Sequence, residues 1–104
     1  MENCIFCKIG TGEIPSEYVF ESKNTFVIKD LHPKAKIHLL VIPKKHYDKF
    51  DAVDDKELVS ELFSTVQAVT RKLGIEDNYR LVINNGKGAG QEVFHLHIHI
   101  LSNK

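Results

Sequence analysis

Three histidines alternate with large apolar residues in the run Phe94-His95-Leu96-His97-Ile98-His99-Ile100-Leu101. Alternation with a period of two is typical of a β-strand whose two faces differ. The strand predicted over residues 94–101 would bury Phe94, Leu96, Ile98 and Ile100 on one face and present the histidines and Leu101 on the other. The chain must therefore fold around a sheet that has one covered face and one accessible face.

The row of imidazoles on that accessible face suggests chemistry. A strand rises about 3.3 Å per residue, so neighbouring rings start roughly 6–7 Å apart and the outer pair roughly 13 Å apart. All three rings cannot easily bind one metal ion, but two of them could bind zinc with a third ligand, as in a zinc-dependent hydrolase. Alternatively, the central His97 could attack phosphorus or carbon as a nucleophile, with His95 and His99 as helpers.

The length of 104 residues, with 42% hydrophobic residues and no repeat or linker, predicts a single domain over residues 1–104, and hydrophobic periodicity predicts its elements. For the long helix, a capping box of Asp54 and Glu57 predicts the start and Gly74 the end. The other predicted elements are a short helix at 4–9, a hairpin of strands 18–21 and 25–29, a central strand 37–42, a strand 79–84 and the histidine strand. This order favours an α+β fold, an antiparallel sheet with the long helix on one face.

Composition narrows the possible partners and the location. The formal net charge is zero, which argues against binding to nucleic acid or to an anionic membrane. No apolar run approaches the length of a membrane span, and no secretory signal pattern precedes Cys4, so we expect a cytoplasmic protein. In that reducing compartment, the Cys4-x-x-Cys7 pair is not expected to form a structural disulfide. The pair could be half of a zinc site, a redox pair or plain packing.

A glycine-rich loop precedes the histidine strand, with Gly86, Gly88 and Gly90 in five residues. Glycines allow backbone N–H groups to approach a ligand closely, and such groups suit phosphate oxygens. The loop alone is a weak signal, because a wide hairpin turn explains it almost as well. Next to three histidines, it favours phosphoryl or nucleotidyl transfer.

Taken together, these motifs resemble the histidine triad family. Residues 95–101 fit its signature, His-φ-His-φ-His-φ-φ with φ apolar, preceded by Gly90-Gln91. The resemblance extends to Ile5-Phe6-x-Lys8-Ile9, Glu13-Ile14-Pro15, Asp30-x-x-Pro33, the run from His38 to His46, and Asn84. It is closest to the Hint branch, whose members hydrolyse purine nucleoside phosphoramidates and aminoacyl adenylates.

The resemblance implies a fold, a set of site residues and a mechanism. The fold would be an antiparallel sheet of about five strands with one long and one short helix, extended across a homodimer. His97 would attack the α-phosphorus of an AMP or GMP moiety and form a covalent intermediate, while His99 contacts the phosphate and His38 and His95 support the site. The implied nucleotide-binding residues are Ile5, Phe6, Ile14, Asp30, Asn84, Gly90, Gln91, His97 and His99.

The resemblance also bears on the cysteines and on selectivity. Relatives with this N-terminal pair hold a structural zinc ion, and here its ligands would be Cys4, Cys7, His46 and His95. One departure is Glu92, which replaces a Ser or Thr that donates toward the leaving group, because an ionised carboxylate only accepts hydrogen bonds. A dinucleoside polyphosphate hydrolase and a nucleotide-binding regulator remain alternative functions.

Overall fold

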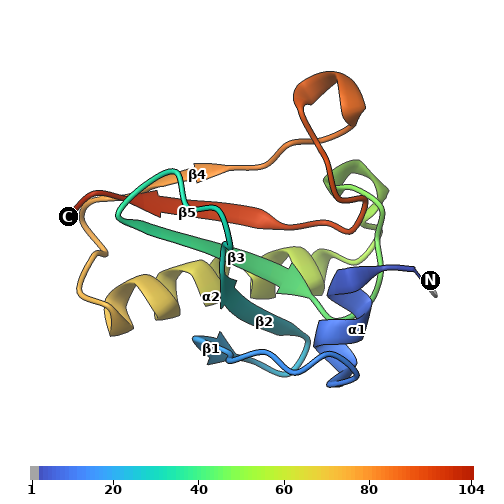
Figure 1. Cartoon of the computed structure of the whole chain (residues 1–104), viewed down its shortest axis with the longest axis horizontal. Coiled ribbons are helices and arrows are strands. Elements are labelled where there is room, and N and C mark those ends of the chain that lie inside the picture. Colours follow the sequence, from blue (N-terminus) through green and yellow to red (C-terminus); the bar gives the residue numbers. More distant parts are fainter. Residues whose placement is uncertain (1–2) are drawn as a thin grey trace.

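The computed structural model describes residues 3–104, and its centre is an antiparallel sheet of five strands in the order β1-β2-β3-β5-β4 (Figure 1). The strands are β1 (Phe20–Glu21), β2 (Thr25–Lys29), β3 (Ile37–Pro43), β4 (Arg80–Val82) and β5 (Ile98–Ser102). The helices are α1 (Ile5–Thr11) and α2 (Lys56–Lys72), with short 3-10 turns η1 (Phe50–Ala52) and η2 (Lys87–Ala89). The predicted α+β fold with one long and one short helix is confirmed.

Helix α2 covers one face of the sheet along its length (Figure 1). Its apolar stripe packs against side chains that point to that face from β2, β3 and β5. The buried residues of this core are Val27, Leu39, Val41, Tyr47, Leu58, Leu62, Val66, Val69, Ile75, Leu96, Ile98 and Ile100. The predicted capping residue was wrong by one position, because Asp55 and not Asp54 accepts from the N–H groups of Glu57 and Leu58.

The opposite face of the sheet is covered only in part, by α1. Cys4 caps this helix, since its sulfur accepts from the Cys7 N–H. Phe6 and Ile9 of the helix pack against a second core formed by Phe26, Ile28, Leu40 and Ile42. Alternation along β3 therefore sends Leu39 and Val41 toward α2, and His38, Leu40 and Ile42 toward the α1 face.

The histidine segment differs from the predicted strand. Ladder pairing begins only at Ile98, because the Leu96 N–H donates to the carbonyl of Tyr47 over 2.7 Å instead of joining the sheet. The predicted burial of Leu96, Ile98 and Ile100 is confirmed, whereas Phe94 is 45% exposed. Strands β1 and β4 are likewise shorter than predicted, at two and three residues. Within residues 3–104, no helix is both long and apolar enough to span a bilayer.

Candidate functional site

His97 lies on the α1 face immediately before β5. Its Nδ1 donates to the carbonyl oxygen of His95 over 2.8 Å. Nδ1 therefore carries a proton, and in the neutral form of the ring Nε2 has a free lone pair. The ring of Phe6 meets His97 edge-on, with ring centroids 5.2 Å apart, and restricts the plane of the imidazole. In the neutral form, the arrangement orients Nε2 as a nitrogen nucleophile requires.

A second chain of hydrogen bonds fixes the protons of His38 and His99. The backbone N–H of Lys34 donates to His38 Nδ1 over 3.1 Å, so Nε2 of His38 carries the proton in the neutral ring. That Nε2 lies 2.9 Å from His99 Nδ1 and 3.4 Å from Asp30 Oδ2. His99 Nδ1 must therefore accept, which leaves an N–H on His99 Nε2 to donate to a ligand.

Burial keeps these rings neutral. Burial, followed by the proximity of His97 and His38, lowers the pKa of His99 to about 4. Burial also lowers the pKa of His38, although Asp30 opposes that shift. Neutral rings at neutral pH are what the two proton assignments require.

The predicted ligands for a nucleotide occupy different parts of this face. Asn84 lines a cavity of about 230 Å³ together with His38 and His99. Asp30 lies at the end of β2, where its Oδ1 accepts from the His32 N–H over 2.8 Å. Asp30 and Asn84 thus flank the paired rings of His38 and His99.

The apolar residues predicted to hold a base come from α1 and the turn after it. Ile5 is 45% exposed on the helix, while Phe6 is buried against the rings of His95 and His97. Ile14 is half-buried on the second core. Of the three, Ile5 is the most available to a ligand, whereas Phe6 also serves the packing of the histidines.

The buried side chain of Gln91 holds the glycine-rich loop through hydrogen bonds. Its Oε1 accepts from the Gly86 N–H over 2.7 Å, and its Nε2 donates to the carbonyl oxygens of Asp48 and Val93. Gly90 adopts a left-handed conformation, with φ of +88°, where the 3-10 turn ends. The Gln91 side chain is therefore engaged by the protein, and the exposed backbone of the loop remains for a ligand.

A second cluster joins the N-terminal helix to the histidine segment. The sulfur and Nδ1 atoms of Cys4, Cys7, His46 and His95 all lie within 4.8 Å of one another. His95 Nδ1 lies 3.2 Å from Cys4 Sγ, and His46 Nδ1 lies 3.3 Å from Cys7 Sγ. Both cysteines are free thiols. The position of His46 was the least obvious from sequence, because it follows a basic stretch.

The chemistry of this donor set fits a tetrahedral metal ion. The other ring nitrogen of His95 donates to the Pro43 carbonyl over 2.7 Å, and that of His46 donates to Asp48 Oδ1 over 2.7 Å. Each Nδ1 lone pair is thereby turned toward the thiols, as metal-binding histidines require. Burial, then the neighbouring Cys4, raises the pKa of Cys7 to about 11. A divalent cation would reverse that shift by favouring the thiolate.

Three residues at the site were not identified from sequence. Arg80 and Val82 line the cavity beside Asn84 because β4 pairs with β5, and Lys34 reaches it from the loop before β3. A period-two reading of residues 80–84 would have placed Arg80, Val82 and Asn84 on one face. Lys34 carries no comparable local signal.

The fold and these two clusters define a class: a small antiparallel α+β protein with a histidine face beside a Cys₂His₂ cluster. The HIT domain family model matches residues 11–104, and the chain belongs to the HIT domain family. Among its relatives is Protein HitA of Neisseria gonorrhoeae, 45% identical over 103 residues, with 97% of this chain and 96% of that protein covered. The HIT-like protein MJ0866 of Methanocaldococcus jannaschii is 48% identical over 94% of this chain and 77% of its own.

Solved structures agree. A HIT family hydrolase from Legionella pneumophila superposes with a TM-score of 0.92 at 43% identity, covering 98% of this chain and 94% of that chain. A histidine triad nucleotide-binding protein from Candida albicans gives a TM-score of 0.90 at 36% identity, covering 98% and 76%. The similarity thus extends over nearly the whole chain.

Proposed function

We propose that this protein is a nucleotide hydrolase that cleaves nucleoside 5′-phosphoramidates or acyl adenylates and releases the nucleoside monophosphate. The observation that carries the proposal is the hydrogen bond from His97 Nδ1 to the His95 carbonyl, since it leaves a nucleophilic Nε2 on the accessible face. The names of two structural neighbours, a hydrolase and a nucleotide-binding protein, support the same class.

In the proposed reaction, His97 Nε2 attacks the α-phosphorus and forms a phosphorus–nitrogen bond as the bond to the leaving amine breaks. A leaving amine takes a proton from solvent as it departs, whereas the carboxylate of an acyl adenylate leaves as the anion. Water then attacks the nucleotidyl-imidazole, which frees His97 and releases AMP or GMP. Splitting the displacement in two is the advantage of a covalent intermediate.

His99 and His38 stabilise charge in this scheme. His99 Nε2–H donates to a phosphate oxygen, and His38 holds that tautomer by donating to His99 Nδ1. A preorganised donor costs no reorganisation as charge develops on the phosphate. His95 positions His97 through its carbonyl and does not react itself.

For the purine nucleotide, we assign the ribose hydroxyls to Asp30 and the phosphate to Asn84, His97, His99 and the backbone of Gly90 and Gln91. The base lies against Ile5, Phe6 and Ile14. Support comes from Asn84 in the histidine cavity and from the exposure of Ile5 on α1.

We further propose that Cys4, Cys7, His46 and His95 bind one structural zinc ion. Four protein ligands would fill a tetrahedral site and leave no position for a reactive water. The cation would tie α1 to the histidine segment and take no part in the reaction. A cytoplasmic location would keep the two thiols reduced.

A homodimer is part of the same proposal. Strand β4 is at the open edge of the sheet in residues 3–104, and Leu81 on it is exposed. Pairing with the β4 strand of a second copy would give hydrogen-bond partners to the unpaired backbone groups of that edge and extend the sheet. Sedimentation should give a dimer at micromolar concentration, and a fully active monomer would contradict this assembly.

Turnover of adenosine phosphoramidate, guanosine phosphoramidate and diadenosine tetraphosphate tests the function. We expect the phosphoramidates to be hydrolysed fastest, with AMP or GMP as product. Preferential cleavage of the tetraphosphate would favour a dinucleoside polyphosphate hydrolase. Tight AMP binding without turnover of any compound would favour a nucleotide-binding regulator.

A zinc-dependent hydrolase is the remaining alternative, and the geometry favours it less. Asp30, His38 and His99 form a second group of candidate metal ligands, with donor atoms within 4.8 Å of one another. His97, however, belongs to neither of the two groups found within residues 3–104. A loss of turnover on chelation, restored by added zinc in a protein that stays folded, would support that alternative.

A further inference from the structure

A groove continues from the histidines toward the end of the sheet where β4 begins. The cavity of about 230 Å³ at His38 and His99 adjoins a larger one of about 320 Å³, and the two share Lys34, Arg80 and Leu101. The larger cavity ends at polar groups of Asn78, Ser102 and Asn103. Its volume alone is within the range of about 300–1,000 Å³ that is usual for small-molecule sites. We call this surface the Lys34–Arg80 groove.

Strand register places the groove and the histidines on one face. Residues directly opposite each other in an antiparallel pair point to the same side of a sheet. Arg80 is opposite Leu101, Val82 is opposite His99, and Leu101 is opposite His38. Arg80 therefore lies on the same face as His99 and is displaced from it by one strand and two residues. In the proposed function, the His99 ring contacts the reacting phosphate.

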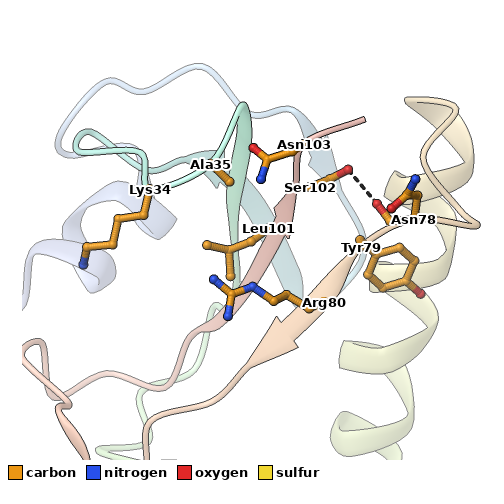
Figure 2. A pocket seen from close by; sticks show the side chains of 8 residues that line it. All are labelled: Lys34, Ala35, Asn78, Tyr79, Arg80, Leu101, Ser102 and Asn103. Carbon is orange, nitrogen blue, oxygen red and sulfur yellow. Dashed lines mark hydrogen bonds between the residues drawn. The ribbon is translucent and has the colours of Figure 1, made fainter.

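The groove is positively charged. Lys34 comes from the loop before β3 and Arg80 from the strand β4; the Arg80 side chain runs toward Leu101, whereas the Lys34 side chain extends away from it (Figure 2). Within residues 3–104, neither side chain forms an ion pair, and no carboxylate is among the lining residues of the two cavities. After burial, which is the main cause, the charges of both cations lower the pKa of His38 further, against the opposing effect of Asp30. The field of these cations thus extends to the histidines.

We propose that the Lys34–Arg80 groove binds a second anionic group of the substrate, a phosphate or a carboxylate, next to the phosphate at His97 and His99. This inference rests on the proposed function, because it describes another part of the same substrate. An arginine fork can bind either group through two parallel hydrogen bonds, and lysine adds a point charge. The groove would then select substrates that carry an acidic group beside the reacting phosphate.

The test uses ligand pairs that differ by one anionic group. For phosphate, calorimetry compares ADP with AMP. For carboxylate, kcat/KM is compared between the adenosine phosphoramidates of β-alanine and of its neutral amide. We expect the wild type to prefer the more anionic member by roughly three- to tenfold, as for a partly exposed charged hydrogen bond. A preference for ADP over AMP would identify the bound group as a phosphate, and a preference for the β-alanine compound over its amide would identify it as a carboxylate.

A double variant, Lys34→Gln with Arg80→Gln, should abolish the preference. The matched control is Lys29→Gln with Lys36→Gln, which removes the same charge at two exposed residues that do not line the groove. The control should retain the preference. In the wild type, the preference should also shrink as salt rises from ~0.05 to ~0.5 M.

The possible failures can be distinguished. If the wild type binds and turns over nucleotides but shows no preference in either ligand pair, the proposal for the groove is wrong and the proposed function stands. The same holds if both double variants lose the preference equally. Failure of the wild type to bind AMP or ADP overturns both.

Discussion

The carbonyl oxygen of His95 accepts from His97 Nδ1 over 2.8 Å, while the His95 side chain lies 3.2 Å from Cys4 Sγ. One residue therefore belongs to the cysteine cluster through its ring and orients the candidate nucleophile through its backbone. Its ring is fully buried, and its Nε2 donates to the Pro43 carbonyl. The position of His97 thus depends on how firmly His95 is held.

Replacement of His97 by alanine should reduce turnover by on the order of 10³-fold or more, because the attacking nitrogen is lost. Nucleotide affinity should change only modestly. Mass spectrometry of wild-type protein quenched with denaturant at alkaline pH, where the phosphorus–nitrogen bond survives, should show an added nucleotidyl group that the variant lacks. His32→Ala, at an exposed histidine, is the control and should remain fully active. An active His97→Ala protein would end the covalent mechanism.

Acid should destabilise the fold in part through His99. Its pKa is lowered to about 4 in the folded state, so between that value and ~6.5 the unfolded chain binds more protons than the folded one. Stabilisation from His99 is present above pH ~6.5 and is lost as pH falls toward 4, by on the order of 3 kcal/mol. His99→Asn should show a shallower fall of unfolding free energy over this range in denaturant titrations. An unchanged slope would contradict the assignment.

Removal of the two thiols by Cys4→Ser with Cys7→Ser should release about one zinc ion per chain and lower the melting temperature. Turnover should remain measurable at temperatures where the variant is folded. Metal content is read by mass spectrometry of the native protein. Zinc that stays stoichiometric in the variant would instead locate the ion at His97 and His99.

Substitution of Asp55 and, for comparison, of Asp54 tests which carboxylate caps the start of α2. Asp55→Ala should cost about 1 kcal/mol of stability, because Asp55 caps two backbone N–H groups. Asp54→Ala removes only a long contact of 3.3 Å with the Tyr47 hydroxyl and should cost less. Chemical denaturation of both variants gives the comparison, and a reversed order would contradict the cap.

Loss of Gln91 should loosen the glycine-rich loop. Gln91→Ala leaves the Gly86 N–H and the Asp48 carbonyl without their partner, at a cost of about 1–3 kcal/mol if both stay dry. Faster hydrogen exchange over residues 86–91 should accompany the loss of stability. Unchanged exchange would show that the loop is held by other contacts.

Local sequence patterns predicted the elements better than the contacts between them. Alternation correctly gave the buried side of Leu96, Ile98 and Ile100, since side-chain direction in an extended chain is a local property. Alternation also predicted too early a start for the histidine strand. The Leu96 N–H donates a hydrogen bond to the carbonyl of Tyr47, which is 49 residues away in sequence, and not to a neighbouring strand. Local spacing cannot encode such a partner.

The same difference between local patterns and long-range contacts is found at the candidate site. The resemblance to the family brought Cys4, Cys7, His46 and His95 together before their positions were known, and the structure places them in one cluster. The pairing of His38 with His99 depends on the register of β3 against β5. Arg80 and Lys34 were missed because the surface they share exists only once β4 has joined the sheet.

The cysteine cluster also has a consequence for how the chain is made. Cys4 and His95 are 91 residues apart, so the four donors can meet only after the whole segment from Cys4 to His95 has left the ribosome. Until then, Cys4 and Cys7 lack the two histidines that complete the cluster. Because His97 follows His95 by two residues, the imidazole of His97 gains its support from the His95 carbonyl at the same late stage. A truncated chain that lacks this segment has neither the complete cluster nor His97.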